Sequence, residues 1–476
     1  MKKIAIILLL SSLNCISQNL AKSISLNYSR KNDVFQVVEE NKKQVSLFFS
    51  DRNNVRTIRF DENFNIIDSL SAERPSRDYY DDIIGYSISG NNYYSYWSSS
   101  NNKEIASQSF DFDGKKVSLT TFKLEFSKEK PIERITINNV FYLVTIVKHT
   151  SILNFYVFND GKMEKKTIDL SSRNFVSYDN QRVNLWEIIS EVTDFDNGLS
   201  VQNILEETPP SLTFSANKKK AYVRDNRLIF TFDNNKGFTQ LINFNINDFT
   251  YEVKSYTQPY IEPTEFDVSQ SNSFLLKNRI IQIKLNTNLM YISVKDLEGN
   301  ELKTFTALAD KEIDFKNSDI IQENGSVVNT RILDKSNQLL RKVSNLNPSL
   351  SCYSYNDKIY FTLGAVSLVQ NNGALYGAMI GGMAGAIIGG AISSSYSVNN
   401  LNSYNGRKVV YINCLFDSEF NHIDGEVKKL AFDELRVFAS KKQDLVSQTV
   451  FKMNSKLYFG GYDKTTRTYS FYSFND

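Results

Sequence analysis

Two histidines are the first residues to consider, because imidazole serves both as a metal ligand and as a general acid or base. They are His149 and His422. Neither has a cysteine or a second histidine at a spacing typical of zinc or iron sites. Both lie where the chain is expected to turn. We therefore interpret them as surface residues and predict no metal site.

Two acidic stretches could also carry chemistry. Asp81 and Asp82 could form a carboxylate pair for sugar hydrolysis, but neighbours in an extended chain point to opposite sides. The turn from Asp417 to Asn421 offers oxygen ligands, yet it lacks the residue order of a calcium loop. We predict a solvated turn there. The sequence contains no nucleophile-elbow motif and no phosphate-binding glycine loop, so we predict no catalytic residue and no cofactor.

The charge balance argues against nucleic acid as a partner. The chain has 476 residues and a formal net charge of +2, so nothing favours phosphate-backbone binding. One basic run, Lys218–Lys219–Lys220, is interpreted as a solvated turn rather than a phosphate-binding patch.

The stretch GALYGAMIGGMAGAIIGGAI, residues 373–392, has a glycine at every fourth position. On a helix, residues four apart share a face, so these glycines would leave a groove for close approach of another backbone. No charged residue occurs between Lys358 and Arg407. The stretch resembles the glycine-zipper elements of bacterial envelope proteins, which implies membrane association or assembly. The candidate site residues are Gly373, Gly377, Gly381, Gly385 and Gly389.

The rest of the chain consists of repeated turns. A polar pair precedes an aromatic or β-branched run seven times, and Asn and Asp in such pairs favour tight hairpins. Aromatic residues make up 13% of the chain, which also favours strands. The seven runs begin at Asn41, Asn91, Asn138, Asp225, Lys277, Asn356 and Asn454.

A second set of turns follows most of these hairpins. FDENFNIID at Phe60–Asp68 matches FDSEFNHID at Phe416–Asp424. The repeating unit is therefore a four-stranded antiparallel meander of about 45–50 residues, which is typical of a β-propeller blade. The chain resembles seven-bladed propellers in general, although six or eight blades remain possible. It lacks the Trp-Asp, kelch and Asp-box motifs, so the resemblance implies an all-β fold and no particular function.

We expect the propeller to comprise residues 18–476, closed by a strand from each end of this range. The last unit lacks one strand, and SISLNY at Ser23–Tyr28 has no partner of its own, so we predict that it completes the last blade.

Two long intervals between the first turns contain NLWEIISEV near Trp186 and SNQLLRKVSN near Leu339, which we predict to be short helices on the propeller face.

The third long interval, residues 364–407, is a glycine-zipper insertion within one blade. The strands on either side of it should be hydrogen-bonded neighbours, so its ends should lie together. A single pass through a bilayer would then bring a polar return segment into lipid. We expect a helical hairpin turning at Gly381–Gly382, or a single helix packed on a partner, on a second copy or on the propeller itself. A disordered or β-aggregating linker is the third alternative.

The cysteines test this strand assignment. Cys352 should lie on the first strand of that blade and Cys414 on the third. Strands two apart are nearly 10 Å apart, which exceeds disulfide reach. We predict two free, buried cysteines.

The start of the chain, MKKIAIILLLSSLNCIS, reads as a signal peptide over residues 1–17. The alternative is a lipoprotein signal with a lipidated Cys15. The Lys-Lys start and Gln18 after the cleavage site resemble exported proteins of Gram-negative Bacteroidetes-type bacteria. This resemblance implies export to the periplasm or to the outer-membrane side of the cell envelope.

Three functions are compatible with these features. The first is a non-enzymatic envelope propeller that binds a protein partner or itself, with membrane association through residues 373–392. The second is a propeller hydrolase with residues gathered from distant blades. The third is a recognition module for a surface polymer such as a glycan, using exposed tyrosines and Trp97.

Overall fold

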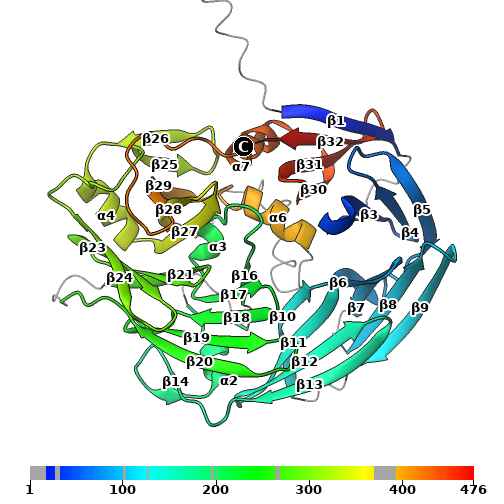
Figure 1. The fold of residues 1–476 in the computed structure, drawn as a ribbon, viewed down its shortest axis with the longest axis horizontal. Helices are drawn as coiled ribbons and strands as arrows, with labels where there is room; N and C mark the ends of the chain where they lie inside the picture. The colour runs from blue at the N-terminus through cyan, green and yellow to red at the C-terminus, as the bar shows by residue number, and fades with distance from the viewer. Residues whose placement is uncertain are drawn as a thin grey trace, which may run out of the picture. The chain divides into compact units, whose positions relative to one another are not determined.

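The computed structural model describes residues 18–26, 33–99, 103–124, 126, 128–193, 198–199, 201–262, 269–368 and 393–475. These residues form seven sheets of four or five strands and one sheet of two strands (Figure 1). They fall into two compact units, Met1–Arg74 with Ser393–Val398 and Lys428–Asp476, and Pro75–Ile392 with Asn399–Val427. The chain is therefore mostly β, as expected.

The first unit contains two four-stranded sheets and the helix α7 (Ala431–Lys441), among other elements. One sheet has the order β2 (Asp33–Glu39), β3 (Gln44–Ser50), β4 (Asn54–Phe60) and β5 (Ile66–Glu73), with the short helix η1 (Glu40–Lys42) in its first turn. The other has the order β1 (Gln18–Ser25), β32 (Thr468–Phe474), β31 (Lys456–Asp463) and β30 (Val446–Met453).

The pairing of β1 with β32 confirms that the first strand completes the last sheet. Ile24 lies opposite Tyr469 in this antiparallel pair. The hydroxyls of Ser23 and Ser470 are 2.8 Å apart. Ile24 and Leu26 then pack in a buried cluster with Phe471, so burial and backbone pairing act together.

The second unit begins with two regular meanders. They are β6 (Tyr80–Ser89), β7 (Asn92–Ser99), β8 (Glu104–Asp111) and β9 (Lys116–Lys123), followed by β10 (Glu129–Ile137), β11 (Val140–Val147), β12 (Ile152–Asn159) and β13 (Lys162–Asp169). A third meander comprises β21 (Gln270–Leu276), β22 (Arg279–Leu285), β23 (Leu289–Asp296) and β24 (Glu301–Leu308).

The other two large sheets depart from the predicted meander. One adds β16 (Gln202–Ile204) in parallel to β17 (Lys219–Arg224), and continues with β18 (Arg227–Phe232), β19 (Phe238–Asn245) and β20 (Tyr251–Thr257). The other has the order β26 (Thr330–Leu333), β25 (Ile320–Asn324), β29 (Lys408–Asp417), β28 (Lys358–Val366) and β27 (Asn347–Tyr355). The prediction of purely antiparallel, consecutive four-stranded units is therefore wrong for these two sheets.

The replacement of the fourth strand has a local cause. After β29 the chain turns at Asp417 and forms only an isolated bridge between Phe416 and His422. No strand follows before the helix α7. β25, which comes earlier in the chain, occupies the vacant edge of β29. The edge is thus covered, as exposed strand edges generally must be.

The tight turns explain why these residues form hairpins. All seven predicted first turns join paired strands, and each contains at least one left-handed residue. Asn138 (φ 49°) and Asn139 (φ 64°) are both left-handed, whereas Lys43 and Gly90 take this role in the first two turns. Asn356 (φ 48°) and Asp357 (φ 57°) do the same between β27 and β28. Asn and Asp tolerate this conformation at lower cost than β-branched residues.

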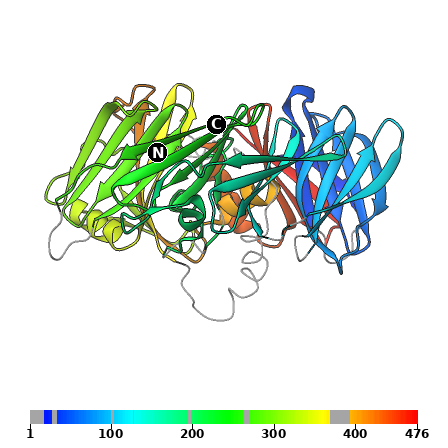
Figure 2. The same ribbon diagram turned by 90° about the horizontal axis from the view of Figure 1, so that it is seen from below.

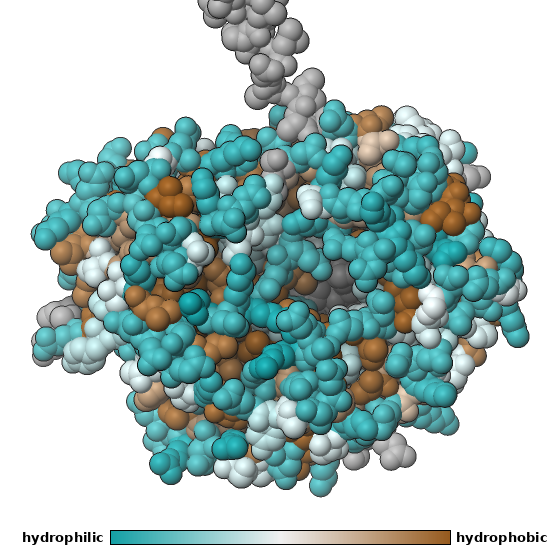
Figure 3. Space-filling view, viewed as in Figure 1, coloured by the Kyte–Doolittle hydropathy of each residue, from teal (hydrophilic) through white to brown (hydrophobic). Residues whose placement is uncertain are grey.

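Short helices cover parts of these sheets. They are α2 (Leu185–Ser190), α3 (Leu212–Ser215), α4 (Ser336–Ser344) and α6 (Ser393–Asn402). α2 and α4 confirm the two helices predicted from apolar spacing. α4 lies at the lower end of its strands in Figure 2 and buries Leu339, Leu340 and Val343 completely. The face shown in Figure 3 is mostly hydrophilic, with apolar side chains in small groups.

Cys352 and Cys414 are free and buried, as predicted. Cys352 and Cys414 each lie opposite Phe361, one on either side of the middle strand β28. The strand spacing holds the two cysteines about 10 Å apart, and burial raises the pKa of both thiols.

We expect neither thiol to react with a disulfide reagent in the native chain, because a buried thiol is rarely ionised. In about 6 M guanidinium both should react, and the chain lacking residues 1–17 should release two equivalents of reporter thiolate. Rapid reaction of one equivalent under native conditions would contradict the burial of Cys352 and Cys414.

Candidate functional site

The glycine-rich insertion leaves and re-enters one sheet at neighbouring strands. β28 and β29 pair along their whole length, ending at Val366 opposite Val409. Residues 364–366 of the predicted insertion thus belong to β28. A Cβ on Gly364 would lie only 2.0 Å from the carbonyl oxygen of Val410, so this strand pair requires glycine there. The two strands that flank the predicted insertion are therefore hydrogen-bonded neighbours.

Hydrogen bonds continue beyond the strand ends and close what we call the insertion neck, residues 367, 407 and 408. The amide of Ser367 donates to the carbonyl oxygen of Lys408 at 2.9 Å. The amide of Lys408 donates in return to the hydroxyl of Ser367 at 2.9 Å. The Arg407 guanidinium donates to the carbonyl oxygen of Ser367 at 2.9 Å. Both ends of the insertion are therefore fixed at one point.

A second anchor lies within the insertion, between residues 373–392 and the neck. The amide of Ser211 donates to Asn400 Oδ1 at 2.7 Å, and the amide of Leu212 donates to the Tyr404 hydroxyl at 2.9 Å. These amides begin α3 and would otherwise have no intrahelical partner. Asn400 Nδ2 also donates to the carbonyl oxygen of Pro209 at 2.9 Å. The last part of the insertion, around Asn400 and Tyr404, is thus held on α3.

The five glycines predicted as site residues, Gly373, Gly377, Gly381, Gly385 and Gly389, lie outside the described residues. The signal peptide and Cys15 also lie outside them. The predicted roles of these residues therefore stay predictions.

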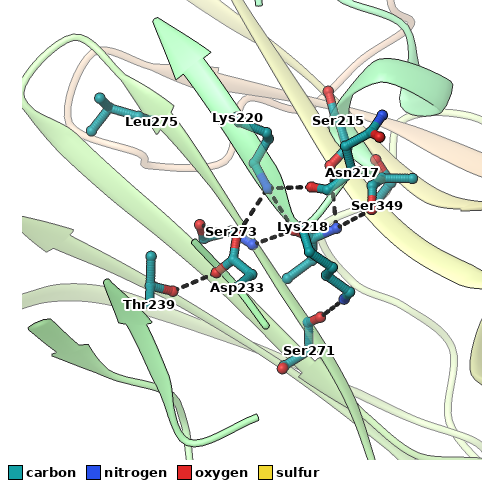
Figure 4. Close-up of polar contacts among 12 residues, drawn as sticks. Ser215, Asn217, Lys218, Lys220, Asp233, Thr239, Ser271, Ser273, Leu275 and Ser349 are labelled. Carbon is teal, nitrogen blue, oxygen red and sulfur yellow. Dashed lines mark hydrogen bonds and ion pairs between the residues drawn. The ribbon is translucent and has the colours of Figure 1, made fainter. Parts of the chain in front are cut away.

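The lysine run is a different kind of site from the one predicted. Lys219 and Lys220 are both fully buried, so the prediction of a solvated turn is wrong. The run lies where the chain enters β17, and the side chains of Lys218 and Lys220 meet polar groups from β21, from Asp233 directly after β18 and from the residues that follow α3 (Figure 4). We call Lys218, Lys219 and Lys220 with Asp233 and Asn272 the lysine cluster.

Lys220 is the centre of this cluster. Its ammonium donates to Asp233 Oδ2 at 2.8 Å, to Asn272 Oδ1 at 2.8 Å and to the carbonyl oxygen of Asn217 at 2.7 Å. These bonds use all three of its donors. Asp233 also accepts from the hydroxyls of Thr239 at 2.7 Å and Ser273 at 2.8 Å. The pair is thus saturated and serves to hold elements together.

Asn272 connects the cluster to the anchor of the insertion. Its amide group donates to the carbonyl oxygen of Pro348 at 2.9 Å and to those of Ser215 and Ala216 at 3.2 Å each. Ser215 ends α3, whose first amides are bonded to Asn400 and Tyr404. The buried charge pair therefore supports the helix that holds the last part of the insertion.

Lys219 and Lys218 use backbone acceptors. The Lys219 ammonium donates to the carbonyl oxygens of Ile189 at 2.8 Å and Glu191 at 3.1 Å, which fixes the end of α2. The Lys218 ammonium donates to the carbonyl oxygen of Ser271. Burial, together with nearby Lys220 and Lys236, lowers the pKa of Lys218 to about 8, against the opposing effect of Asp233.

We expect Asp233→Asn to lower the free energy of unfolding by about 3–5 kcal/mol, because it leaves the Lys220 ammonium buried without its counter-charge. The double variant Lys220→Met/Asp233→Leu should be more stable than Asp233→Asn alone. Urea unfolding measures both. The control is Glu312→Gln, which removes an exposed ion pair with Lys316 and should cost about 1 kcal/mol or less. Equal losses of unfolding free energy in Asp233→Asn, in the double variant and in Glu312→Gln would contradict the role of the buried pair.

The pKa of Lys218 predicts a pH dependence. A lysine whose pKa is lower in the folded chain destabilises the fold at pH values where both states are charged, below about 8. That cost disappears as pH rises through the unfolded value of about 10.4. Lys218→Met should therefore gain about 1–2 kcal/mol over the parent chain at pH 7, and this gain should shrink by pH 10. Urea midpoints at both pH values measure it; a pH-independent difference would contradict the assignment.

A surface hollow of about 490 Å³ is the second polar site in this unit. It is lined by His149, Arg173, Arg182 and Glu187, among others. The His149 ring lies 5.4 Å from that of Trp186. His149 is exposed, as predicted, but the sequence did not indicate that two arginines, far from it in sequence, would lie beside it. The hollow could hold an anionic group.

The remaining candidates have structural roles. His422 is partly buried, with Nε2 3.0 Å from Asn317 Oδ1. Asp417 Oδ1 accepts from the amides of Glu419 at 2.9 Å and Asn421 at 2.8 Å. Hydrogen bonds from the Asn421 side chain and from turn amides lower the pKa of Asp417. This carboxylate closes a solvated turn, in agreement with the prediction.

Two other predicted positions lie on strands. Asp81 and Asp82 are exposed on β6, next to an irregular register between Tyr80 and Asp82. Trp97 is only 1% exposed, so its predicted role in an exposed aromatic surface is wrong. β7 is an inner strand with both faces covered, which a period-two pattern alone does not reveal.

Within the described ranges, no group of three or more His, Cys, Asp or Glu side chains is arranged to hold a metal ion. A search of the same residues finds no helix with the length and apolar character needed to cross a bilayer.

No protein-family model matches the chain, and no curated protein does. Among solved structures, it is similar to the WD40 domain of SCAP from fission yeast, with 9% identity, a TM-score of 0.29 and coverage of 95% of this chain and 98% of that one. It is also similar to hydrazine synthase of Kuenenia stuttgartiensis, with 9% identity, a TM-score of 0.29 and coverage of 90% and 91%.

Dihydro-heme d1 dehydrogenase NirN is a third similar structure, with 8% identity, a TM-score of 0.27 and coverage of 58% of this chain. The match spans about half of that protein, 48%. Similarities as low as these three do not distinguish an enzyme from a binding protein.

Proposed function

We propose that this chain is an exported, non-enzymatic binding or scaffold protein of the cell envelope, built as a seven-bladed β-propeller. In this proposal, the glycine-zipper insertion associates with a membrane or joins copies of the chain. The seven sheets of four or five strands among the described residues support the blade number. The signal-like residues 1–17 support export to the periplasm or the outer-membrane side.

The insertion neck is the observation that carries this proposal. Ser367 and Lys408 join the two ends of the insertion by reciprocal hydrogen bonds. Asn400 and Tyr404 fix the returning chain on α3. A loop without a role needs no such double attachment, whereas a segment that presents a binding surface gains from a rigid base.

The glycine spacing indicates what the insertion binds. Five glycines in one register would allow a backbone to approach closely, and the intervening residues are apolar and uncharged. Both properties suit either a lipid environment or a second copy of the same segment. They do not suit a water-exposed linker, which would be rich in Gly and Ser without large aliphatic residues.

A second candidate is recognition of an acidic surface polymer. The hollow beside His149 favours it, because Arg173 and Arg182 could bind carboxylates or sulfates of such a polymer. The third candidate, a hydrolase, gains no support from the described residues.

The test removes residues 373–392, which lie between the two anchors. We expect the variant to keep its thermal unfolding temperature within a few degrees, because the insertion neck and the α3 anchor remain. It should be lost from the membrane fraction, or from its oligomer, when cell envelopes are fractionated and sized. A second variant, Gly377→Leu/Gly381→Leu, keeps the full chain length and replaces two of the five glycines by large side chains. Unchanged fractionation and size for both would exclude this function.

A further inference from the structure

A group of basic side chains surrounds the insertion neck. Arg331 belongs to β26, Arg341 and Lys342 belong to the last turn of α4, and Lys408 begins β29. Arg331 and Arg341 are exposed, and the other two are partly exposed. These residues come from three separate elements, so their meeting is a result of the fold. We call the four side chains the basic neck surface.

Backbone hydrogen bonds hold the β25–β26 hairpin beside the neck. The amide of Gly325 donates to the carbonyl oxygen of Arg407 at 2.8 Å, and the amide of Gly406 donates to that of Gly325 at 3.1 Å. α4 is held by complete burial of Leu339, Leu340 and Val343 in the core that includes β28 and β29. The basic residues therefore have fixed positions relative to the neck.

The cations lie close enough to repel one another. Burial is the largest cause that lowers the pKa of Lys342. The positive charges of Arg331, Lys408 and Arg341 lower it further. Among the described residues, none of the four side chains forms an ion pair with a carboxylate. Glu323, the buried acid of the adjacent β25, accepts instead from the Tyr411 hydroxyl at 2.9 Å. The exposed acid in the turn after β26 is Asp334.

Two apolar side chains near the neck are also exposed. Val328 is 71% exposed at the hairpin tip, and Leu368 is 54% exposed directly after the neck. Leu368 follows Ser367, whose amide is bonded to Lys408, so charged and apolar groups both border the neck. A soluble polyanion offers a partner only to the cations, whereas a membrane offers phosphates to the cations and acyl chains to the apolar residues.

We propose that the basic neck surface binds the phosphate groups of an anionic lipid membrane and orients the insertion towards it. This inference rests on the membrane-associated form of the proposed function and adds a lipid preference to it. Two weak signals, one apolar and one electrostatic, commonly combine in peripheral membrane binding. Each basic residue near an anionic surface strengthens partitioning about fivefold.

The experiment is co-sedimentation of the full-length mature chain with vesicles. One set is phosphatidylcholine alone, and the other contains about one third phosphatidylglycerol. The test variant is Arg331→Gln/Arg341→Gln/Lys342→Gln. The matched control is Lys116→Gln/Lys162→Gln/Arg227→Gln, which removes three exposed cations at the starts of β9, β13 and β18.

We expect the parent chain and the control variant to prefer anionic vesicles by tenfold or more, and the test variant to lose that preference. Its binding to neutral vesicles should be unchanged. Raising the salt concentration from about 0.1 M to about 0.5 M should weaken the preference of the parent chain, because the screening length shortens. Equal preference in the test and control variants would overturn the inference.

The deletion of residues 373–392 separates this inference from the proposed function. If the insertion supplies the apolar part, the deletion should reduce binding to both kinds of vesicle while keeping the preference for anionic ones. Lack of binding to neutral vesicles by the parent chain, with the anionic preference intact, would refute only membrane association through the insertion. Tighter binding of the parent chain to soluble heparin than to anionic vesicles would overturn the lipid assignment.

Discussion

Hydrogen bonding between neighbouring strands is the constraint on which the other features depend. A chain that leaves one strand of an antiparallel pair must re-enter at the end of the other, as β28 and β29 do around the insertion. The same ladder separates Cys352 from Cys414 by placing Phe361 between them. Tight turns with left-handed residues set its register, because a slip by one residue would turn buried side chains to solvent.

Burial of charge is the second organising feature. The Lys220–Asp233 pair lies in the interior and is kept there by a complete set of hydrogen bonds. Replacing such pairs by apolar residues is often neutral for stability, so their value lies in fixing geometry. Here Asn272, which is bonded to Lys220, fixes the positions of the helix α3 and the strand β27. The cluster thus holds α3 and β27 together.

Much of the fold could be predicted because its signals are local. The Asn and Asp pairs of the hairpins report backbone angles directly, and the apolar spacing around Leu339 reports one buried helix face. The twin turns at Asp61 and Asp417 even share a left-handed phenylalanine, Phe64 and Phe420, both with φ of 58°. These features depend on neighbours within a few residues.

The incorrect predictions concern distant neighbours. The acceptors of Lys220 include Asn272, 52 residues away, and nothing in a run of three lysines indicates such a partner. Trp97 is buried because other strands cover both faces of β7. The basic neck surface joins residues 331, 341, 342 and 408, which no sequence spacing relates. The candidate binding features were therefore harder to predict than the fold that carries them.

The pairing of β1 with β32 also has a consequence for the order of folding. Ser23 and Ser470 are 447 residues apart, yet they lie side by side in one sheet. Bringing such distant positions together costs about 5 kcal/mol of chain entropy, which the finished sheet must offset. During synthesis, β1 is made long before β32. The sheet is therefore completed only after β32 has been made, and until then the edge of β1 that pairs with β32 has no partner strand.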